Sequence, residues 1–203
     1  YSVMKSDFNE VKLHFSTSEI QVNDIRTDVG TFSRLTMDGY YSTTQVGNPE
    51  LPTMIKMIEI PLCGNVQARV VSSTSRTVSG NELGIEYPVY PAQPSRSKSD
   101  DGPFTLVKNE TTYTTNAFYS RPLVSVEKTG IMRSVNMATV SVCPVTYNPV
   151  TNEFTIYDDI TVEITFDNAD IAATQRMKTL HSNSFFNTNS QIINPIQSNE
   201  RDV

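Results

Sequence analysis

The sequence predicts an all-β fold, an antiparallel β-sandwich or jelly roll with one short helix near its C-terminal end. Apolar and polar residues alternate in many short segments, which is the pattern of half-buried strands. Turn-forming residues separate these segments at short intervals, as in sandwiches and barrels. Of the 203 residues only 19% are charged, whereas 21 are Ser and 24 are Thr. A chain of this length folds as one domain that buries roughly 70% of its unfolded surface.

In the first half, alternation and turn residues predict four strands. Val11, Leu13 and Phe15 alternate with polar neighbours, and Gly30 with Asp38-Gly39 brackets the next strand. An apolar run then ends at Pro61, which has no amide to offer a strand ladder. The predicted strands are 11–15, 31–36, 53–60 and 67–78.

The second half reads as strands 123–127, 131–133 and 135–145, with a break at Gly130. A turn cluster at 147–153 then leads into one long arm of a hairpin, 154–166. Its apolar residues share one face, and Asp158-Asp159 in its middle predicts a bulge or kink. The hairpin is expected to pack its apolar face on the core.

Helical periodicity is found only at 170–180, where Asp170 can cap the first turn. We expect Ile171, Ala172, Met177 and Leu180 to form its buried face. The polar, Asn-rich residues that follow depend on a neighbour for order. The expected organisation is a sandwich domain over 1–186 and a polar tail over 187–203.

The composition excludes several classes of protein. With two His, two Cys and no C-x-x-C pair, the chain lacks the ligands of a zinc ribbon or an iron–sulfur site. A net charge of −6 argues against nucleic acid as a partner, and no apolar run approaches the ~20 residues of a membrane span. We therefore expect no cofactor, no nucleic acid and no membrane as partner, and an extracytoplasmic location without an attached leader segment.

Catalysis within this chain is not expected. A nucleophile needs a base and an orienting group within hydrogen-bond reach, and Cys63, Cys143, His14 and His181 form no evident set. Cys63 and Cys143 are either small apolar residues or the two halves of one disulfide, because the sequence does not give their separation.

Three short motifs allow both a functional and an ordinary interpretation. Asp100-Asp101 and Asp158-Asp159 could bind calcium, but neither has the spacing of a calcium loop, so solvated acidic turns are favoured and no metal site is expected. Asn109-Glu110-Thr111 matches a glycosylation sequon, which also occurs by chance.

The segment 87–101 is the one long loop. Pro88, Pro91 and Pro94 keep it extended, and Arg96 and Lys98 then stand among Ser residues. An extended backbone with small neighbours and a projecting basic side chain is the form in which a peptide enters a protease cleft. The ordinary alternative is a solvated basic loop.

Five segments are informative through their order and spacing. They are Gly47-Asn48-Pro49-Glu50-Leu51-Pro52, the loop from Gln93 to Asp101, Thr129-Gly130-Ile131-Met132-Arg133, Asn148-Pro149-Val150 and Ala173-Thr174-Gln175-Arg176. Together they resemble the propeptide of the gingipains, which are cysteine peptidases with a caspase-like catalytic domain, and most closely the lysine-specific branch. The resemblance covers about 47–186.

The resemblance implies a non-catalytic β-sandwich prodomain that keeps a secreted bacterial peptidase latent, between periplasm and cell surface. Its partner would be the downstream catalytic domain, which carries the catalytic Cys and His. Lys98 matches the basic residue that fills the specificity pocket, and Arg96 is a departure two residues earlier. The rest of this inhibitory loop is Ser97, Ser99, Asp100 and Asp101. Glu200-Arg201-Asp202-Val203 resembles a maturation junction, cut between Arg201 and Asp202.

Two other interpretations stay open. A carbohydrate-binding or adhesive sandwich could use Tyr40-Tyr41, Tyr87 and Tyr90 as an aromatic platform, although the chain has no Trp. The second of these is a structural domain of a secreted protein that binds no ligand. The sequence also leaves open whether the cognate peptidase prefers Lys or Arg.

Overall fold

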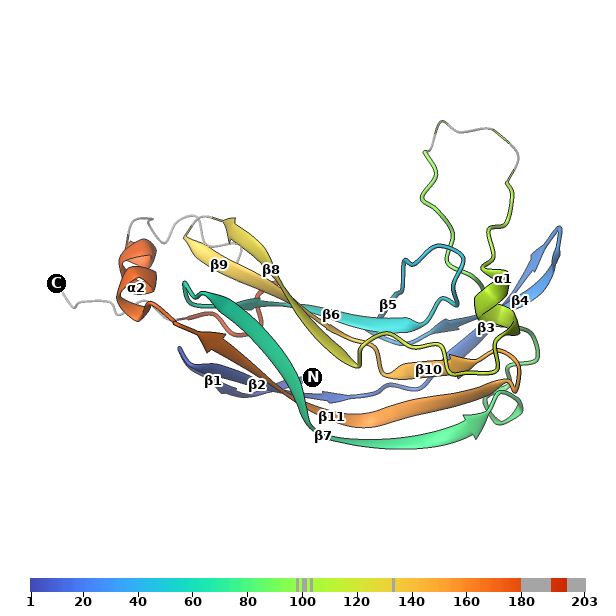
Figure 1. Ribbon diagram of the computed structural model, residues 1–203, viewed down its shortest axis with the longest axis horizontal. Coiled ribbons are helices and arrows are strands. Elements are labelled where there is room, and N and C mark those ends of the chain that lie inside the picture. Colours follow the sequence, from blue (N-terminus) through green and yellow to red (C-terminus); the bar gives the residue numbers. More distant parts are fainter. Residues whose placement is uncertain (98, 100–101, 103, 133, 180–190, 197–203) are drawn as a thin grey trace.

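The computed structural model describes residues 1–97, 99, 102, 104–132, 134–179 and 191–196, and shows an elongated sandwich of two sheets (Figure 1). Every strand pair is antiparallel, which confirms the predicted fold class. The first sheet holds β1 (Ser2–Ser6), β2 (Glu10–Ser16), β7 (Asn65–Ser79), β10 (Val145–Asn148) and β11 (Glu153–Asp167). The second holds β5 (Tyr41–Ser42), β6 (Pro52–Glu59), β8 (Val124–Met132) and β9 (Val135–Val142). A separate hairpin is formed by β3 (Gln21–Thr27) and β4 (Gly30–Thr36), and the helical elements are η1 (Asn81–Leu83), α1 (Glu110–Thr114) and α2 (Ile171–Thr179).

The long strand β11 organises the first sheet. One of its edges pairs with β7 from end to end, and the other pairs first with β10 and then with β2. The register against β7 shifts between Tyr157 and Asp159, so the bulge predicted at Asp158-Asp159 is confirmed. A strand of 15 residues is about 48 Å long, so β11 runs nearly the whole length of the sandwich.

The core lies between the two sheets. Apolar residues of β2 and β11 face those of β6 and β9, as the alternation predicted, and burying each large aliphatic side chain stabilises the fold by about 1.5–3 kcal/mol. A second cluster lies beneath β4, β10 and the first part of β11. The members of the first cluster are Val11, Leu13, Phe15, Met54, Ile58, Ile60, Ala138, Val140, Val142, Ile160, Val162, Ile164 and Phe166.

Two predicted strand boundaries were wrong. Gly130 does not interrupt its strand: β8 continues through it, and the register against β9 merely shifts between Lys128 and Gly130. Conversely, the predicted strand 135–145 is two strands in different sheets. The chain crosses between the sheets at Cys143-Pro144, because Pro144 has no amide with which to continue the β9 ladder.

Helix α2 begins where it was predicted, since the Asp170 carboxylate accepts a hydrogen bond from the Ala173 amide at 2.8 Å. The expected buried face was wrong, because Thr174 and Lys178 are its buried residues, whereas Ile171 is 39% exposed. Leu180 lies outside the described residues. The helix therefore docks through polar contacts rather than through an apolar stripe.

Part of the expected tail belongs to the sandwich. Ile192 bridges to Met57 in parallel, and the Ile193 amide donates to the Met57 carbonyl at 3.1 Å. The Asn194 side chain continues this contact along β6. Residues 191–196 thus cover the outer edge of β6 next to α2.

Candidate functional site

The loop 93–108, called the finger loop below, leaves the sandwich at the end opposite α2 and projects beyond both sheets (Figure 1). Its described residues form no regular secondary structure, apart from a turn at Ser99 and a bend at Gly102. Phe104 and Val107 on its returning side are 42% and 40% exposed. The loop is therefore an extended projection, and its orientation depends on how its base is held.

The base of the finger loop is closed by one side chain. The Gln93 amide nitrogen donates to the Val107 carbonyl at 2.8 Å, and its oxygen accepts from the Val107 amide at 2.9 Å. The same nitrogen also donates to the Pro91 carbonyl at 2.8 Å. Gln93 thus reproduces, with its side chain, the pair of hydrogen bonds that a neighbouring strand residue would make.

A second layer of contacts lies directly beneath. The Gly47 amide donates to the Ala92 carbonyl at 2.7 Å, and the Gly47 carbonyl accepts from the Asn109 amide at 2.8 Å. Gly47 therefore lies between the two sides of the finger loop. Its φ of +81° favours glycine, and a Cβ there would lie 3.1 Å from the Asn109 nitrogen. We call Gly47, Ala92, Gln93, Val107 and Asn109 the neck.

Helix α1 braces the neck. The side chain of Asn109 caps the helix, because its oxygen accepts from the Thr112 backbone amide at 3.4 Å. The Nδ2 of the same side chain donates to Asn48 Oδ1 at 3.0 Å. The Thr112 hydroxyl donates to the same Asn48 oxygen at 2.6 Å. Tyr113 donates to the Val89 carbonyl at 2.6 Å, and burial raises the pKa of this phenol, so it stays a donor. The asparagine of the predicted sequon is thus engaged in the brace.

The described part of the tip is also held together. Arg96 Nη2 donates to the Gly102 carbonyl at 2.7 Å across the loop, and the hydroxyls of Ser97 and Ser99 lie 2.9 Å apart. The guanidinium of Arg96 therefore makes a contact within the finger loop itself. Of the predicted site residues, Lys98, Asp100, Asp101, Arg201 and Asp202 lie outside the described residues.

The two cysteines are free thiols in the structure and do not form the disulfide that the sequence allowed. Cys63 is half-buried near Lys128, and burial raises the pKa of its thiol. Cys143 is buried, with its Sγ 3.4 Å from the Thr53 hydroxyl. Sequence alone did not separate the two alternatives, because the residues lie in different surroundings that only the fold defines.

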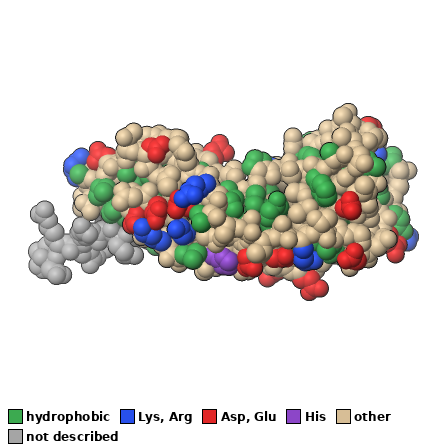
Figure 2. Space-filling model, turned by 60° about the horizontal axis from the view of Figure 1, so that its bottom comes forward, with side chains coloured by type: hydrophobic (Ala, Val, Ile, Leu, Met, Phe, Trp, Pro, Cys, Tyr) green, Lys and Arg blue, Asp and Glu red, His purple; other side chains and the backbone are tan. Residues whose placement is uncertain are grey.

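The remaining candidates are engaged in surface pairs. The Asp158 carboxylate accepts from Arg76 at 3.2 Å, and Asp159 lies 3.4 Å from His14 Nε2. Among the described residues no group of three or more potential metal ligands occurs. No helix in the described part of the chain is long and apolar enough to cross a membrane. On the face shown in Figure 2, acidic and basic side chains are interspersed and form no continuous basic stripe.

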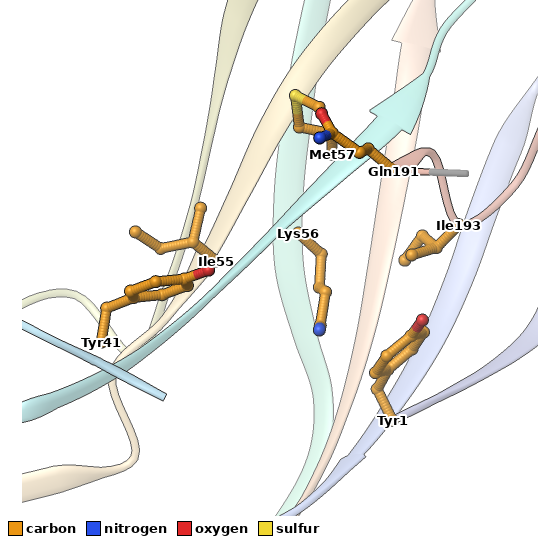
Figure 3. A pocket seen from close by; sticks show the side chains of 7 residues that line it. All are labelled: Tyr1, Tyr41, Ile55, Lys56, Met57, Gln191 and Ile193. Atoms are coloured by element: carbon orange, nitrogen blue, oxygen red, sulfur yellow. The ribbon is translucent and has the colours of Figure 1, made fainter. Parts of the chain in front are cut away.

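The four tyrosines of the carbohydrate interpretation do not share one surface. Tyr90 is 7% exposed and stacks edge-on against Phe32, whereas Tyr41 is 64% exposed on β5. Tyr41 lines a separate cavity of about 480 Å³ at the outer edge of β6 (Figure 3). Across the cavity the Lys56 ammonium lies 4.4 Å from the centre of the Tyr1 ring. The full lining is Tyr1, Tyr41, Ile55, Lys56, Met57, Gln191 and Ile193.

The comparisons with known proteins agree with this architecture. The model of the Propeptide_C25 family matches residues 2–194. The chain belongs to the Propeptide_C25 family. As a member of this family it is the non-catalytic propeptide domain of a gingipain-type cysteine peptidase, and the resemblance stated from the sequence is confirmed.

Two relatives from Porphyromonas gingivalis show how far the similarity extends. Lys-gingipain is 35% identical over 186 residues, which are 90% of this propeptide and 11% of the relative. Gingipain R1 is 23% identical over 156 residues, 75% of this propeptide and 15% of the relative. The propeptide thus spans about a tenth of the length of the lysine-type relative.

Two solved structures share the fold. One, from work on the zymogenic latency of gingipain K of Porphyromonas gingivalis, has a TM-score of 0.76 and 32% identity, covering 83% of this propeptide and 92% of that chain. The other is the complex of the RgpB pro- and mature domains from Porphyromonas gingivalis. It has a TM-score of 0.70 and 19% identity, covering 83% of this propeptide and 86% of that chain.

Proposed function

We propose that this propeptide keeps a gingipain-type cysteine peptidase latent by placing the finger loop in the active-site cleft of that peptidase. Lys98 would fill the primary specificity pocket, and removal of the propeptide would follow cleavage between Arg201 and Asp202. The partner would be the catalytic domain of the same precursor, in an extracytoplasmic compartment. The relatives support this proposal, because they are gingipains and the solved structures concern zymogen latency and a complex of pro- and mature domains.

The observation that carries the proposal is the neck. An inhibitor that binds through a projecting loop loses affinity if the loop must be ordered on binding. Here Gln93 joins both sides of the finger loop at Val107, and Gly47 joins Ala92 to Asn109 beneath it. These contacts order the base of the finger loop in the free propeptide, so less ordering remains to be paid when the loop binds to a cleft.

The contacts at the tip favour Lys98 over Arg96 as the residue in the pocket. The Arg96 guanidinium donates to the Gly102 carbonyl and so crosses the base of the tip. A guanidinium used within the loop is not the one expected in a pocket, and Lys98 is the other basic residue between 96 and 102. A lysine ammonium in a carboxylate-lined pocket gains charge-assisted hydrogen bonds away from water.

The test is inhibition of the mature peptidase in trans by the separate propeptide. Truncating a buried charged partner costs ~2–5 kcal/mol, so Lys98→Ala should raise the inhibition constant by roughly 30-fold to several thousand-fold. Arg26→Ala is the matched control, since Arg26 is an exposed basic residue of β3, and should leave inhibition unchanged.

Arg96→Ala should weaken inhibition less than Lys98→Ala, because it loosens the tip without emptying the pocket. Equal inhibition by the wild type and Lys98→Ala would overturn the pseudo-substrate role. A larger loss for Arg96→Ala than for Lys98→Ala would move the pocket-filling residue by two positions.

A further inference from the structure

The outer edge of β6, which is the edge that does not pair with β9, is covered at both ends and open in the middle. β5 pairs with it at Pro52 and Thr53, and the Ile193 amide donates to the Met57 carbonyl at 3.1 Å. Between Thr53 and Met57 no strand of the described residues pairs with this edge. Four residues of a strand rise about 13 Å, so this opening, called the edge gap below, can take about three residues of another segment.

Ile55 lies in the middle of the edge gap. In an antiparallel strand the backbone groups of every second residue point to the same edge, so the Ile55 amide and carbonyl point outward as the Met57 carbonyl does. No hydrogen bond from another described residue reaches either group. The Ile55 side chain is 40% exposed. An open edge of this kind is a template to which a further strand can add.

The edge gap faces the cavity of about 480 Å³, a volume typical of ligand pockets (Figure 3). Tyr41 and Ile55 lie on one side of the cavity, and Tyr1 lies on the other. The rings of Tyr41 and Tyr1 are 64% and 54% exposed. Tyr1 is next to β1 in the first sheet, so the cavity is a cleft between the edges of the two sheets, with apolar surface on both sides.

Lys56 supplies the charge of this cleft. Its side chain points across the cavity, and its ammonium lies 4.4 Å from the centre of the Tyr1 ring (Figure 3). In the described part of the chain no carboxylate forms an ion pair with it. A cation that faces only an aromatic ring still lacks a charge-assisted hydrogen bond, so the cleft favours a ligand that brings a carboxylate.

We propose that the edge gap binds an extended acidic peptide segment of a partner protein, which adds to β6 as an antiparallel strand. The peptide residue opposite Ile55 exchanges two backbone hydrogen bonds with it. The preceding peptide residue lies opposite Lys56, where a Glu carboxylate meets the ammonium. This binding is independent of the proposed inhibition, because no residue that lines the cavity belongs to the finger loop or the neck.

The first test uses the tripeptide acetyl-Glu-Val-Thr-amide, in which Val is designed to face Ile55 and Glu to face Lys56. Calorimetric titration of the 203-residue propeptide should give a dissociation constant below about 1 mM. A methyl group on the Val nitrogen removes the donor to the Ile55 carbonyl and should abolish binding. Absence of binding by the first peptide, or equal binding by the methylated one, would overturn the inference.

The second test changes the amide of Ile55. Ile55→Pro removes only a donor that points away from β9, and proline is tolerated at such edge positions, so the ladder with β9 stays intact. The dissociation constant should rise about fivefold or more, whereas Ile55→Val keeps the amide and should bind as the wild type does. Circular dichroism establishes that Ile55→Pro is folded. If folded Ile55→Pro binds normally, the peptide does not pair with β6.

The third test changes the charge. Lys56→Met should raise the dissociation constant about two- to fivefold, as expected for an ion pair near the surface. Acetyl-Lys-Val-Thr-amide should bind the wild type more weakly than the Glu peptide does. Lys108→Met is the matched control, because Lys108 also lies over a tyrosine ring, 5.3 Å from the centre of Tyr113, but outside the cavity. An unchanged constant for Lys56→Met would show that the cleft does not select acidic segments.

Discussion

The Glu59 carboxylate and the Lys178 ammonium form an ion pair, 2.6 Å apart, that is almost completely buried between β6 and α2. Both groups also bind the backbone of Ile196: its amide donates to the Glu59 carboxylate, and its carbonyl accepts from the Lys178 ammonium. Burying charges is costly unless each has a partner, so such a pair contributes little net stability while intact, and much is lost when one member is removed.

Removing Lys178 alone should therefore destabilise the propeptide strongly. Lys178→Met leaves the Glu59 carboxylate buried without its cation, and the free energy of unfolding should fall by about 3–5 kcal/mol. Urea denaturation followed by circular dichroism measures this loss. Glu59→Gln added to Lys178→Met should recover part of it, because no charge is then left buried. Ordinary surface substitutions change the free energy of unfolding by up to about 0.5 kcal/mol. A change no larger than this in Lys178→Met would contradict the prediction.

The same variant should respond to acid in a defined direction. Burial raises the pKa of Glu59 above its ordinary 4.5, against the opposing effect of Lys178. A carboxyl with a raised pKa binds its proton more tightly in the folded state, so its contribution to stability is full below pH 4.5 and is lost as pH rises through the raised value. The deficit of Lys178→Met should therefore shrink on acidification from neutral pH. Urea midpoints across this range test it, and a constant deficit would refute it.

Gly47, the glycine of the neck, should be difficult to replace. Gly47→Ala adds a Cβ 3.1 Å from the Asn109 nitrogen at a φ of +81°, so strain of roughly 1–3 kcal/mol is expected, together with weaker inhibition of the peptidase. Gly39→Ala is the matched control, because Gly39 has a φ of +76° with no atom near the added Cβ. Inhibition constants and thermal unfolding separate the two. An unaltered inhibition constant for Gly47→Ala would show that the neck does not position the loop.

Gln93 should matter for inhibition and hardly for folding. Gln93→Ala removes the two hydrogen bonds between the Gln93 side chain and the Val107 backbone, called the clamp here. Both hydrogen bonds are exposed, so the free energy of unfolding should change by less than about 0.5 kcal/mol. Inhibition should weaken, because the finger loop must then be ordered when it binds. Gln67→Ala is the control, since Gln67 makes a comparable exposed contact with Asp167 outside the finger loop. Equal inhibition by both variants would argue against a pre-ordered finger loop.

Thiol titration should detect two free cysteines in propeptide that has never been reduced. Cys63 should react slowly in the folded state and faster at alkaline pH, because burial raises the pKa of its thiol. Cys143 should react only after unfolding. Cys63→Ser should abolish the thiol reaction of the folded protein, which assigns that reaction to Cys63. If the unfolded, unreduced protein contains no reactive thiol, the two residues form a disulfide after all.

The sequence predicts the parts of the fold that depend on local pattern. The alternation in β2 and β11, the bulge at Asp158-Asp159 and the cap at Asp170 all follow from neighbouring residues. Helix α1 could not be predicted, because its Thr-rich residues have little helical preference and are held by Asn48 and Val89, far away in the sequence.

The candidate site shows the same division. The extended, basic character of the finger loop is visible in Pro94, Arg96 and Lys98. The neck is not, because its contacts join Gly47 to Asn109 and Gln93 to Val107 across the fold. The apolar face expected for α2 fails for this reason as well, since the partner of Lys178 is Glu59, on a strand of the core.

The clamp made by Gln93 also bears on solubility. A projection built as a long β-hairpin would present two open strand edges, to which the strands of other molecules could add. Here both sides of the loop are joined by a side chain and by Gly47 rather than by a ladder of backbone hydrogen bonds. The finger loop can therefore project from the propeptide without offering neighbouring molecules a strand edge on which to aggregate.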